Sequence, residues 1–230
     1  MEQNSLMELP TGKLLDKFGS GGHKPGSGSA AALMGILSGK LVVTVTALSL
    51  TKQKYRNDWP KIEYIKGQIE NEIEPELKRL FEYDSQVFDQ VIKLRVKRDQ
   101  AKSEKEKRKF REEALEKLRE ATEIPRDICT LCLKLIDHGV GVFDIGFQSA
   151  RGDTGAAVSA AVAGAMSSIF VINLNLRSFR GSEWANEMRN HCDRLHKELE
   201  EKQMEAFGRV TTLKEEDVES MQFSFEGSNK

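Results

Sequence analysis

The chain has 230 residues and a mass of 25.9 kDa, which suits one large domain or two small ones with a real core. Its 35 basic and 36 acidic residues argue against a general nucleic-acid binder, because such a protein needs a large basic excess. The first ten residues lack the layout of a secretory signal, and three cysteines give no disulfide framework. We therefore expect a cytoplasmic protein.

Apolar residues recur with helical spacing along the chain, and no stretch alternates with the period of a strand. We predict a short helix around residues 14–18 that ends at the glycine-rich segment 19–22. A second helix opens near residue 25 and runs to about Leu50. A long helical element then covers residues 62–91. Pro75 should bend or restart it, because proline lacks a backbone donor.

Beyond the charged stretch 98–109, the pattern predicts three further helical segments. Ser103 and Glu106 fit a capping box that opens a helix to Ala121, and Pro125 starts or kinks a continuation to His138. Three glycines predict a loop over 139–152. The remaining predicted segments are a helix capped by Asp153 and Thr154 that ends near Leu176, and an amphipathic helix capped by Ser182 that fades near Phe207.

We predict an all-α, single-domain helical bundle over residues 1–210 and a polar, disordered tail over 211–230. Two predicted helices carry no charge over residues 25–39 and 154–176. Their content of Ala, Gly, Ser, Thr and Asn argues against a membrane span, and small residues four apart let helices approach closely. We expect a buried central pair and no membrane. A helix so fully buried in a chain of this size also indicates a subunit interface.

The richest local motif is the glycine-rich segment 23–31, HKPGSGSAA. No strand precedes it, which argues against a dinucleotide fingerprint, and Pro25 after Lys24 excludes a phosphate-binding loop. A glycine-rich loop that feeds a helix N-terminus can hold an anion or a carbonyl oxygen. The alternative is a flexible connector that caps a helix.

Two carboxylates and a basic group have both structural and functional interpretations. Asp84 lies on an apolar stripe, so it pairs with a buried Lys or Arg or faces a pocket. Asp153 is a helix N-cap or a carboxylate at the mouth of the central pair. Three basic residues follow the second helix, Lys52, Lys54 and Arg56, and Tyr55 lies among them. The basic side chains interact with the helix dipole or attract an acidic ligand.

The cysteines do not form a metal motif. Cys129 and Cys132 lie three positions apart in an apolar helical stretch, and the third cysteine, Cys192, offers no tetrahedral completion. We therefore expect buried core thiols and no metal site.

Several short motifs, in order, resemble those of the formiminotetrahydrofolate cyclodeaminase and methenyltetrahydrofolate cyclohydrolase family. Residues 25–33 read PGSGSAAAL and resemble its P-G-G-G-S-x-A-A-L opening. Residues 48–55 read LSLTKQKY and resemble its L-T-x-G-K-K-x-Y segment. Shorter matches to D-x-x-A-F, A-T-E-V-P, S-D and I-N-L occur at 84–88, 121–125, 152–153 and 174–176. The resemblance covers about residues 10 to 205 without large insertions.

The resemblance implies an all-helical bundle that forms a homodimer and processes one-carbon folates. The implied reaction closes the formimino group of 5-formiminotetrahydrofolate with release of ammonia, or hydrolyses 5,10-methenyltetrahydrofolate. Either reaction needs proton transfer, which a carboxylate in a dry pocket can supply. No metal or bound cofactor is implied, because the folate is itself the substrate.

The resemblance also assigns roles by position. Asp153 would be the acid/base or would grip the pterin, with Lys52 and Tyr55 lining the pocket. Asp84 would orient a polar group there. The backbone N–H groups of the glycine-rich loop would bind the ligand; the loop residues are Gly26, Ser27, Gly28 and Ser29. Lys54 and Arg56 would attract the glutamyl carboxylates of the folate. This hypothesis requires Lys52, Asp84 and Asp153 to converge on one sheltered cavity, and we expect the two uncharged helices to bring them there.

Four positions depart from the family pattern: Ser27 replaces a glycine, Gly152 a serine, and Phe147 and Val171 asparagines. The last two remove amides that would hydrogen-bond a pterin. One alternative is therefore a non-catalytic binding or scaffold protein that keeps the bundle and docks partners on the charged stretch 98–109 or the acidic tail. Another is a related hydrolase with a non-folate substrate.

Overall fold

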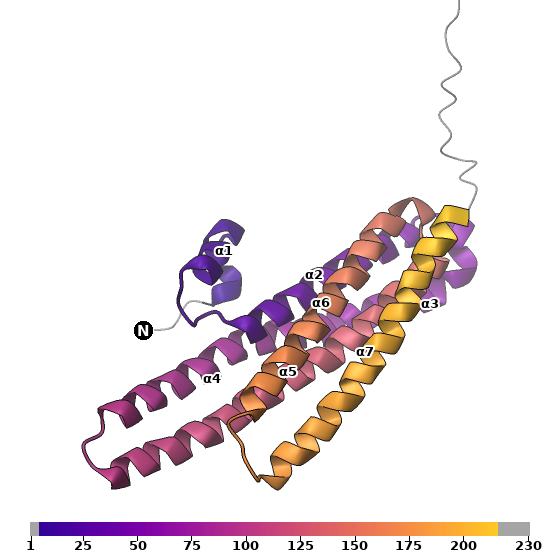
Figure 1. The fold of residues 1–230 in the computed structure, drawn as a ribbon. Helices are drawn as coiled ribbons and strands as arrows, with labels where there is room; N and C mark the ends of the chain where they lie inside the picture. Colours follow the sequence, from indigo (N-terminus) through magenta and orange to yellow (C-terminus); the bar gives the residue numbers. More distant parts are fainter. Residues whose placement is uncertain (1–4, 216–230) are drawn as a thin grey trace, which may run out of the picture.

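The computed structural model describes residues 5–215, and this part of the chain is helical without any strand (Figure 1). The α-helices are α1 (Thr11–Gly19), α2 (Ser27–Leu50), α3 (Trp59–Gln68), α4 (Glu74–Gln100), α5 (Glu104–Ile145), α6 (Arg151–Leu176) and α7 (Glu183–Glu215). Short 3-10 turns lie at Leu6–Glu8, Gln53–Asp58 and Gln148–Ala150. The prediction of an all-α bundle is confirmed.

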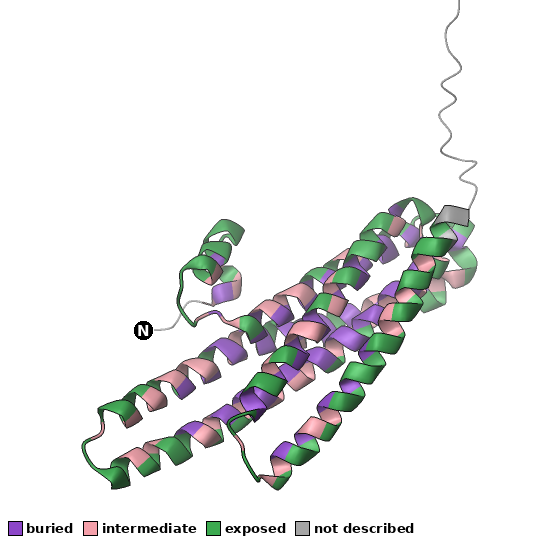
Figure 2. Cartoon of the chain, viewed as in Figure 1, coloured by how far each residue is buried: buried purple, intermediate pink, exposed green. Residues whose placement is uncertain are grey.

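Four helices, α2, α4, α5 and α6, form the core of the bundle. Helix α5 packs against α4, α2 and α6, and α2 packs against α4 and α6. Helix α7 lies along α5 and α6 on one side, whereas α1 stands beside the start of α2 (Figure 1). Buried residues run along the inner faces of the core helices, and the exposed residues concentrate at the helix ends and on α7 (Figure 2).

The predicted interruption at Pro75 takes the form of a π-helical turn. The turn covers Ile69–Ile73 and joins α3 to α4, with Pro75 in the first turn of α4. Proline cannot donate the hydrogen bond that would continue the α-helical pattern, and a π turn absorbs the resulting mismatch. The element therefore restarts at this point rather than ending in a loop.

The predicted loop over residues 139–152 is wrong in most of its length. Helix α5 continues through Pro125 and ends at Ile145, so only Gly146 and Phe147 separate it from the next turn. A Cβ atom on Gly139 would lie 2.5 Å from a methyl carbon of Val158. The glycine therefore serves close packing of α5 on α6 rather than a turn.

Helices α2 and α6 pack closely and run antiparallel. A Cβ atom on Gly164 of α6 would lie 2.9 Å from the carbonyl oxygen of Ala31. Near the other end of α2, the Ser49 hydroxyl accepts a hydrogen bond from the backbone N–H of Phe147, at 2.8 Å. The predicted pair of central small-residue helices is confirmed.

By length and composition, Ser27–Leu50 and Gln148–Leu176 could each cross a membrane. Their inner faces, however, bury polar side chains and small residues against the rest of the bundle, as core helices do; the buried polar residues include Ser29, Ser38, Thr46, Ser168 and Asn175. A lipid-facing helix gains nothing from such groups. The structure therefore favours the interpretation as core helices.

The helix ends agree with the predicted caps in two cases. Ser103 and Glu106 form the predicted capping box at the start of α5. The Ser182 hydroxyl lies 3.4 Å from the N–H of Ala185 at the start of α7. Helix α7 continues to Glu215 instead of fading near Phe207. The rest of the predicted tail, residues 216–230, lies outside the described residues.

Candidate functional site

The candidate site residues form two separate groups at opposite ends of α2. The first, called here the loop cluster, consists of Gly26, Ser27, Gly28, Ser29 and Asp84. The second, called the platform, consists of Lys52, Lys54, Tyr55, Phe147 and Gln148. Helix α2 has 24 residues between the two groups, so roughly 36 Å separates them. Within a single chain, the predicted convergence of Lys52, Asp84 and Asp153 on one cavity therefore does not occur.

In the loop cluster, Asp84 caps the start of α2 from another helix. Its Oδ2 atom accepts hydrogen bonds from the backbone N–H of Ser29, at 2.8 Å, and from the Ser29 hydroxyl, at 2.9 Å. The N-cap residue of α2 is Gly26, which has no side chain to satisfy these donors. The predicted pairing of Asp84 with a buried basic side chain is wrong, since its hydrogen-bond partner is the N-terminus of α2. That Asp84 also faces a pocket stays a prediction.

The same contact explains the glycine at position 28. A Cβ atom there would collide with the Asp84 carboxylate. Ser27, by contrast, is exposed at the first position of α2, so the departure from the family glycine costs no packing. The structure thus separates a loop position that requires glycine from one that does not.

Burial raises the pKa of Asp84 above its ordinary value of 3.8, although both hydrogen bonds from Ser29 act in the opposite direction. A carboxyl group whose pKa is raised by folding stabilises the fold at low pH, and this stabilisation is lost as the pH rises through the folded-state pKa. We therefore expect the stability of the wild type, relative to Asp84→Asn, to fall as the pH rises above about 4.

Urea unfolding of both proteins between about pH 3.5 and 8 measures this difference. Asp89→Asn is the matched control on the same helix. Lys93 and His23 lower the pKa of Asp89, so its stabilisation should be lost as the pH falls instead. A wild type that gains stability over Asp84→Asn with rising pH would contradict the interpretation.

At the other end of α2, the platform is held together by hydrogen bonds between η2 (Gln53–Asp58) and the segment that joins α5 to α6. The buried Tyr55 hydroxyl accepts a hydrogen bond from the backbone N–H of Gln148, at 3.2 Å. The Lys54 ammonium donates to the Gln148 side-chain oxygen, also at 3.2 Å. Sequence reasoning missed Gln148, because a backbone N–H is available from almost any residue type.

Phe147 gives the platform its aromatic surface. Its ring packs edge-on against Tyr55, with centroids 6.2 Å apart and an interplanar angle of 79°. The Lys52 ammonium lies 4.9 Å from the centroid of the Phe147 ring, within the range of a cation–π contact. Phe147, which stands where the family pattern has asparagine, therefore replaces an amide by a ring that positions both Lys52 and Tyr55.

Asp153 lies just beyond the platform, in the first turn of α6. The N-cap of this helix is Ala150, so the prediction that Asp153 caps the helix is wrong. Its side chain is exposed and makes no hydrogen bond or ion pair with any described residue. A carboxylate in a first turn is favoured by the helix dipole. Asp153 is therefore available to a ligand, as is the exposed Arg56.

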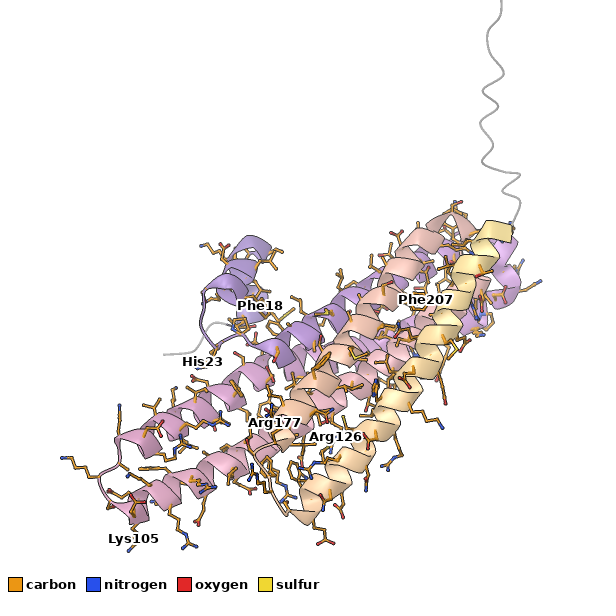
Figure 3. All side chains as sticks on the ribbon, in the orientation of Figure 1. Phe18, His23, Lys105, Arg126, Arg177 and Phe207 are labelled. Atoms are coloured by element: carbon orange, nitrogen blue, oxygen red, sulfur yellow. The ribbon has the colours of Figure 1, made fainter. Side chains whose placement is uncertain are left out.

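Two other features of the structure involve none of these residues, although the first reaches Arg151 and Gly152, which precede Asp153 in the sequence. A mostly apolar cavity of about 350 Å³ between α5, α6 and α7, bordered by Phe207 (labelled in Figure 3), contains none of the predicted site residues. Cys129 and Cys132 are buried in α5, as predicted, and burial raises the pKa of Cys129 to about 12. Within residues 5–215, no group of three or more His, Cys, Asp or Glu side chains is arranged to hold a metal ion.

Comparison with known proteins shows to which family the chain belongs. The family model described as formiminotransferase-cyclodeaminase matches residues 10–194. The chain is 28% identical over 173 residues to a methenyltetrahydrofolate cyclohydrolase of Methylorubrum extorquens, an alignment that covers 75% of this chain and 82% of the relative. The crystal structure of a formiminotetrahydrofolate cyclodeaminase from Thermotoga maritima has a similar fold. The alignment of the two structures has a TM-score of 0.78 at 19% sequence identity, and it covers 90% of this chain and 98% of the cyclodeaminase. The chain therefore belongs to the formiminotransferase-cyclodeaminase family.

Proposed function

We propose that the protein is a one-carbon folate enzyme that hydrolyses 5,10-methenyltetrahydrofolate. Family membership and the similarity to a cyclohydrolase over most of both chains support this substrate class. The observation that carries the proposal is the unpartnered carboxylate of Asp153 beside the Lys52–Phe147–Tyr55 platform. We also place the enzyme in the cytoplasm, which its three free, buried cysteines support.

In the proposed reaction, water adds to the carbon that bridges N5 and N10 of the folate. Asp153 accepts a proton from the water as its oxygen bonds to that carbon. Asp153 then returns this proton to one of the two nitrogens as the bond between that nitrogen and the carbon breaks. The hydroxyl group on the carbon loses its remaining proton to solvent, so that a formyl group remains on the other nitrogen and one proton is released overall. The half-buried Phe147 ring, held edge-on by Tyr55, provides an apolar surface for the pterin, and Lys54 and Arg56 attract the glutamyl carboxylates.

The two clusters of a single chain are too far apart to share a ligand, so we propose a homodimer. The outer faces of α2 and α6 expose large apolar side chains, with Leu37 55%, Leu174 63% and Phe170 70% accessible. Large apolar side chains left exposed on two neighbouring helices are typical of an interface on a soluble protein. These two helices are the ones whose composition would otherwise indicate a membrane.

A twofold axis across the middle of α2 would place the two copies of this helix antiparallel. The beginning of α2 in one protomer would then lie beside the end of α2 in its partner. This arrangement joins the loop cluster of one chain to the platform of the other. Each dimer would thus contain two equivalent sites, each built from both chains.

Charge on the outer face should break the dimer. We expect Leu37→Glu combined with Phe170→Glu to convert the protein to a monomer, because the interface would bury unpaired carboxylates. Light scattering after size-exclusion chromatography measures the mass. Tyr64→Glu is the control, since Tyr64 is 63% accessible but lies on α3. A wild type that is monomeric at micromolar concentration would refute the homodimer.

Mixing two inactive variants tests the shared site directly. Ser27→Trp fills the loop cluster at an exposed position, and Asp153→Asn removes the carboxylate beside the platform. Half of the randomly reassembled dimers are hybrids with one fully native site, so the mixture should recover about a quarter of wild-type activity. If the mixture stays inactive although hybrids form, the two clusters do not act together.

The activity assay follows the absorbance of the methenyl group with purified protein. Loss of absorbance from 5,10-methenyltetrahydrofolate indicates hydrolysis, the proposed activity. Formation of absorbance from 5-formiminotetrahydrofolate indicates cyclodeamination, the second candidate, which the likeness to the Thermotoga maritima fold favours. No change with either substrate would refute both. Calorimetry with a tetrahydrofolate analogue would then separate a binding protein from a hydrolase with another substrate.

A further inference from the structure

A second cavity, which is polar, lies near the far end of the α4–α5 hairpin, away from the proposed folate site. It has a volume of about 360 Å³, within the range of small-molecule sites. Three arginines from two helices line it: Arg95 and Arg98 from α4 and Arg111 from α5. Ser178, in the segment between α6 and α7, adds a hydroxyl group, and the remaining lining residues are apolar (Ala114, Leu115, Leu118). We call this the arginine cavity.

The charges of the arginine cavity are poorly compensated. Arg98 pairs with the neighbouring Asp99 at 2.8 Å. Arg95 and Arg111, in contrast, make no hydrogen bond or ion pair with any residue in the described range 5–215. No acidic side chain lines the cavity.

Several other basic residues of the hairpin already have partners. Lys107 pairs with Glu104 and Arg108 with Glu112, both within α5. The unpaired Arg95 and Arg111 thus line the same cavity from two different helices. Arg177, labelled in Figure 3, immediately precedes Ser178 and adds a further positive charge at this end of α6.

We propose that the arginine cavity binds a small, multiply charged oxyanion, either a phosphate compound or a polycarboxylate. A guanidinium group presents paired N–H donors that match the oxygens of phosphate and carboxylate groups. Two such groups from facing helices, with the Ser178 hydroxyl, provide donors on several sides of one ligand. The apolar lining strengthens these interactions by excluding part of the water.

This site is distinct from the proposed folate site. Arg95 follows Asp84 by 11 residues on α4, which corresponds to roughly 16 Å along the helix axis. No residue of the loop cluster or the platform lines the cavity. Binding of an oxyanion here can therefore be tested whether or not the protein acts on folates.

The test is calorimetric titration of the full-length protein with tripolyphosphate and, separately, with citrate at low ionic strength. We expect at least one of them to bind, with the affinity falling as salt is added. Arg95→Gln and Arg111→Gln should each raise the Kd about tenfold or more, because each removes charge-assisted hydrogen bonds. Arg79→Gln is the matched control on α4, since Arg79 is exposed and pairs with Glu76.

The outcomes separate the two sources of the ligand. Tighter binding of tripolyphosphate assigns the cavity to phosphate compounds, and tighter binding of citrate assigns it to polycarboxylates. Absence of binding by both anions overturns the proposal. An equal loss of affinity in Arg79→Gln also overturns it, because the attraction would then be a general effect of surface charge. Arg111 is exposed and unpaired, so Arg111→Gln tests the proposal even if Arg95→Gln does not fold.

Discussion

Asp153→Asn should lower turnover of the folate substrate about a hundredfold or more, because asparagine cannot accept the proton from water. The fold should hardly change. Asp153 is exposed and does not cap α6, so the variant loses only the interaction with the helix dipole, worth less than about 1 kcal/mol. Steady-state kinetics and urea unfolding of the same preparations measure the two effects.

Asp193→Asn is the control for Asp153→Asn, because Asp193 is an exposed carboxylate on α7, remote from both clusters. Its turnover should match that of the wild type. If Asp153→Asn keeps more than about a tenth of wild-type turnover, Asp153 is not the general base. If its KM rises while kcat stays constant, the carboxylate grips the pterin instead.

Gly164→Val should destabilise the protein by about 3 kcal/mol, at the upper end of the cost of overpacking a core. Even a single methyl group on Gly164 would lie 2.9 Å from both the carbonyl oxygen of Ala31 and the Sγ atom of Cys132. The carbonyl belongs to the backbone of α2, so relief requires the central helices to move apart. Urea unfolding at neutral pH measures the loss.

Gly67→Ala provides the comparison for Gly164→Val. Gly67 is also helical, but the nearest atom to its Cβ position is 3.8 Å away, an ordinary van der Waals contact. Alanine there should stabilise the protein by about 0.5–1 kcal/mol, because it reduces the freedom of the unfolded chain. Similar values for the two variants would show that α2 and α6 separate without cost.

Most of the helices could be predicted from the spacing of apolar residues, because that spacing reflects which face is buried. The predicted loop after His138 failed for a specific reason. Glycine is required both where a chain turns and where two helices approach closely, and Gly139 serves the second purpose against Val158. A single sequence does not distinguish these causes, since both follow from the missing Cβ atom.

The candidate site was predicted less completely than the fold. Three residues of the platform, Lys52, Lys54 and Tyr55, could be grouped from the sequence because they lie next to one another along the chain, whereas Gln148 could not. Their distance from Asp84 depends on the length and direction of α2, which no local motif encodes. The capping contact between Asp84 and Ser29 spans 55 positions, so it depends on the packing of α4 against α2.

That long-range cap has a consequence for the order of folding. A helix with a local N-cap can start to form as an isolated peptide, whereas the first turn of α2 acquires its acceptor only after α4 has docked. The glycine-rich loop then takes its final shape with the tertiary structure and not before it. In the nascent chain, the glycine-rich segment 23–31 would therefore stay unformed until synthesis had passed residue 84.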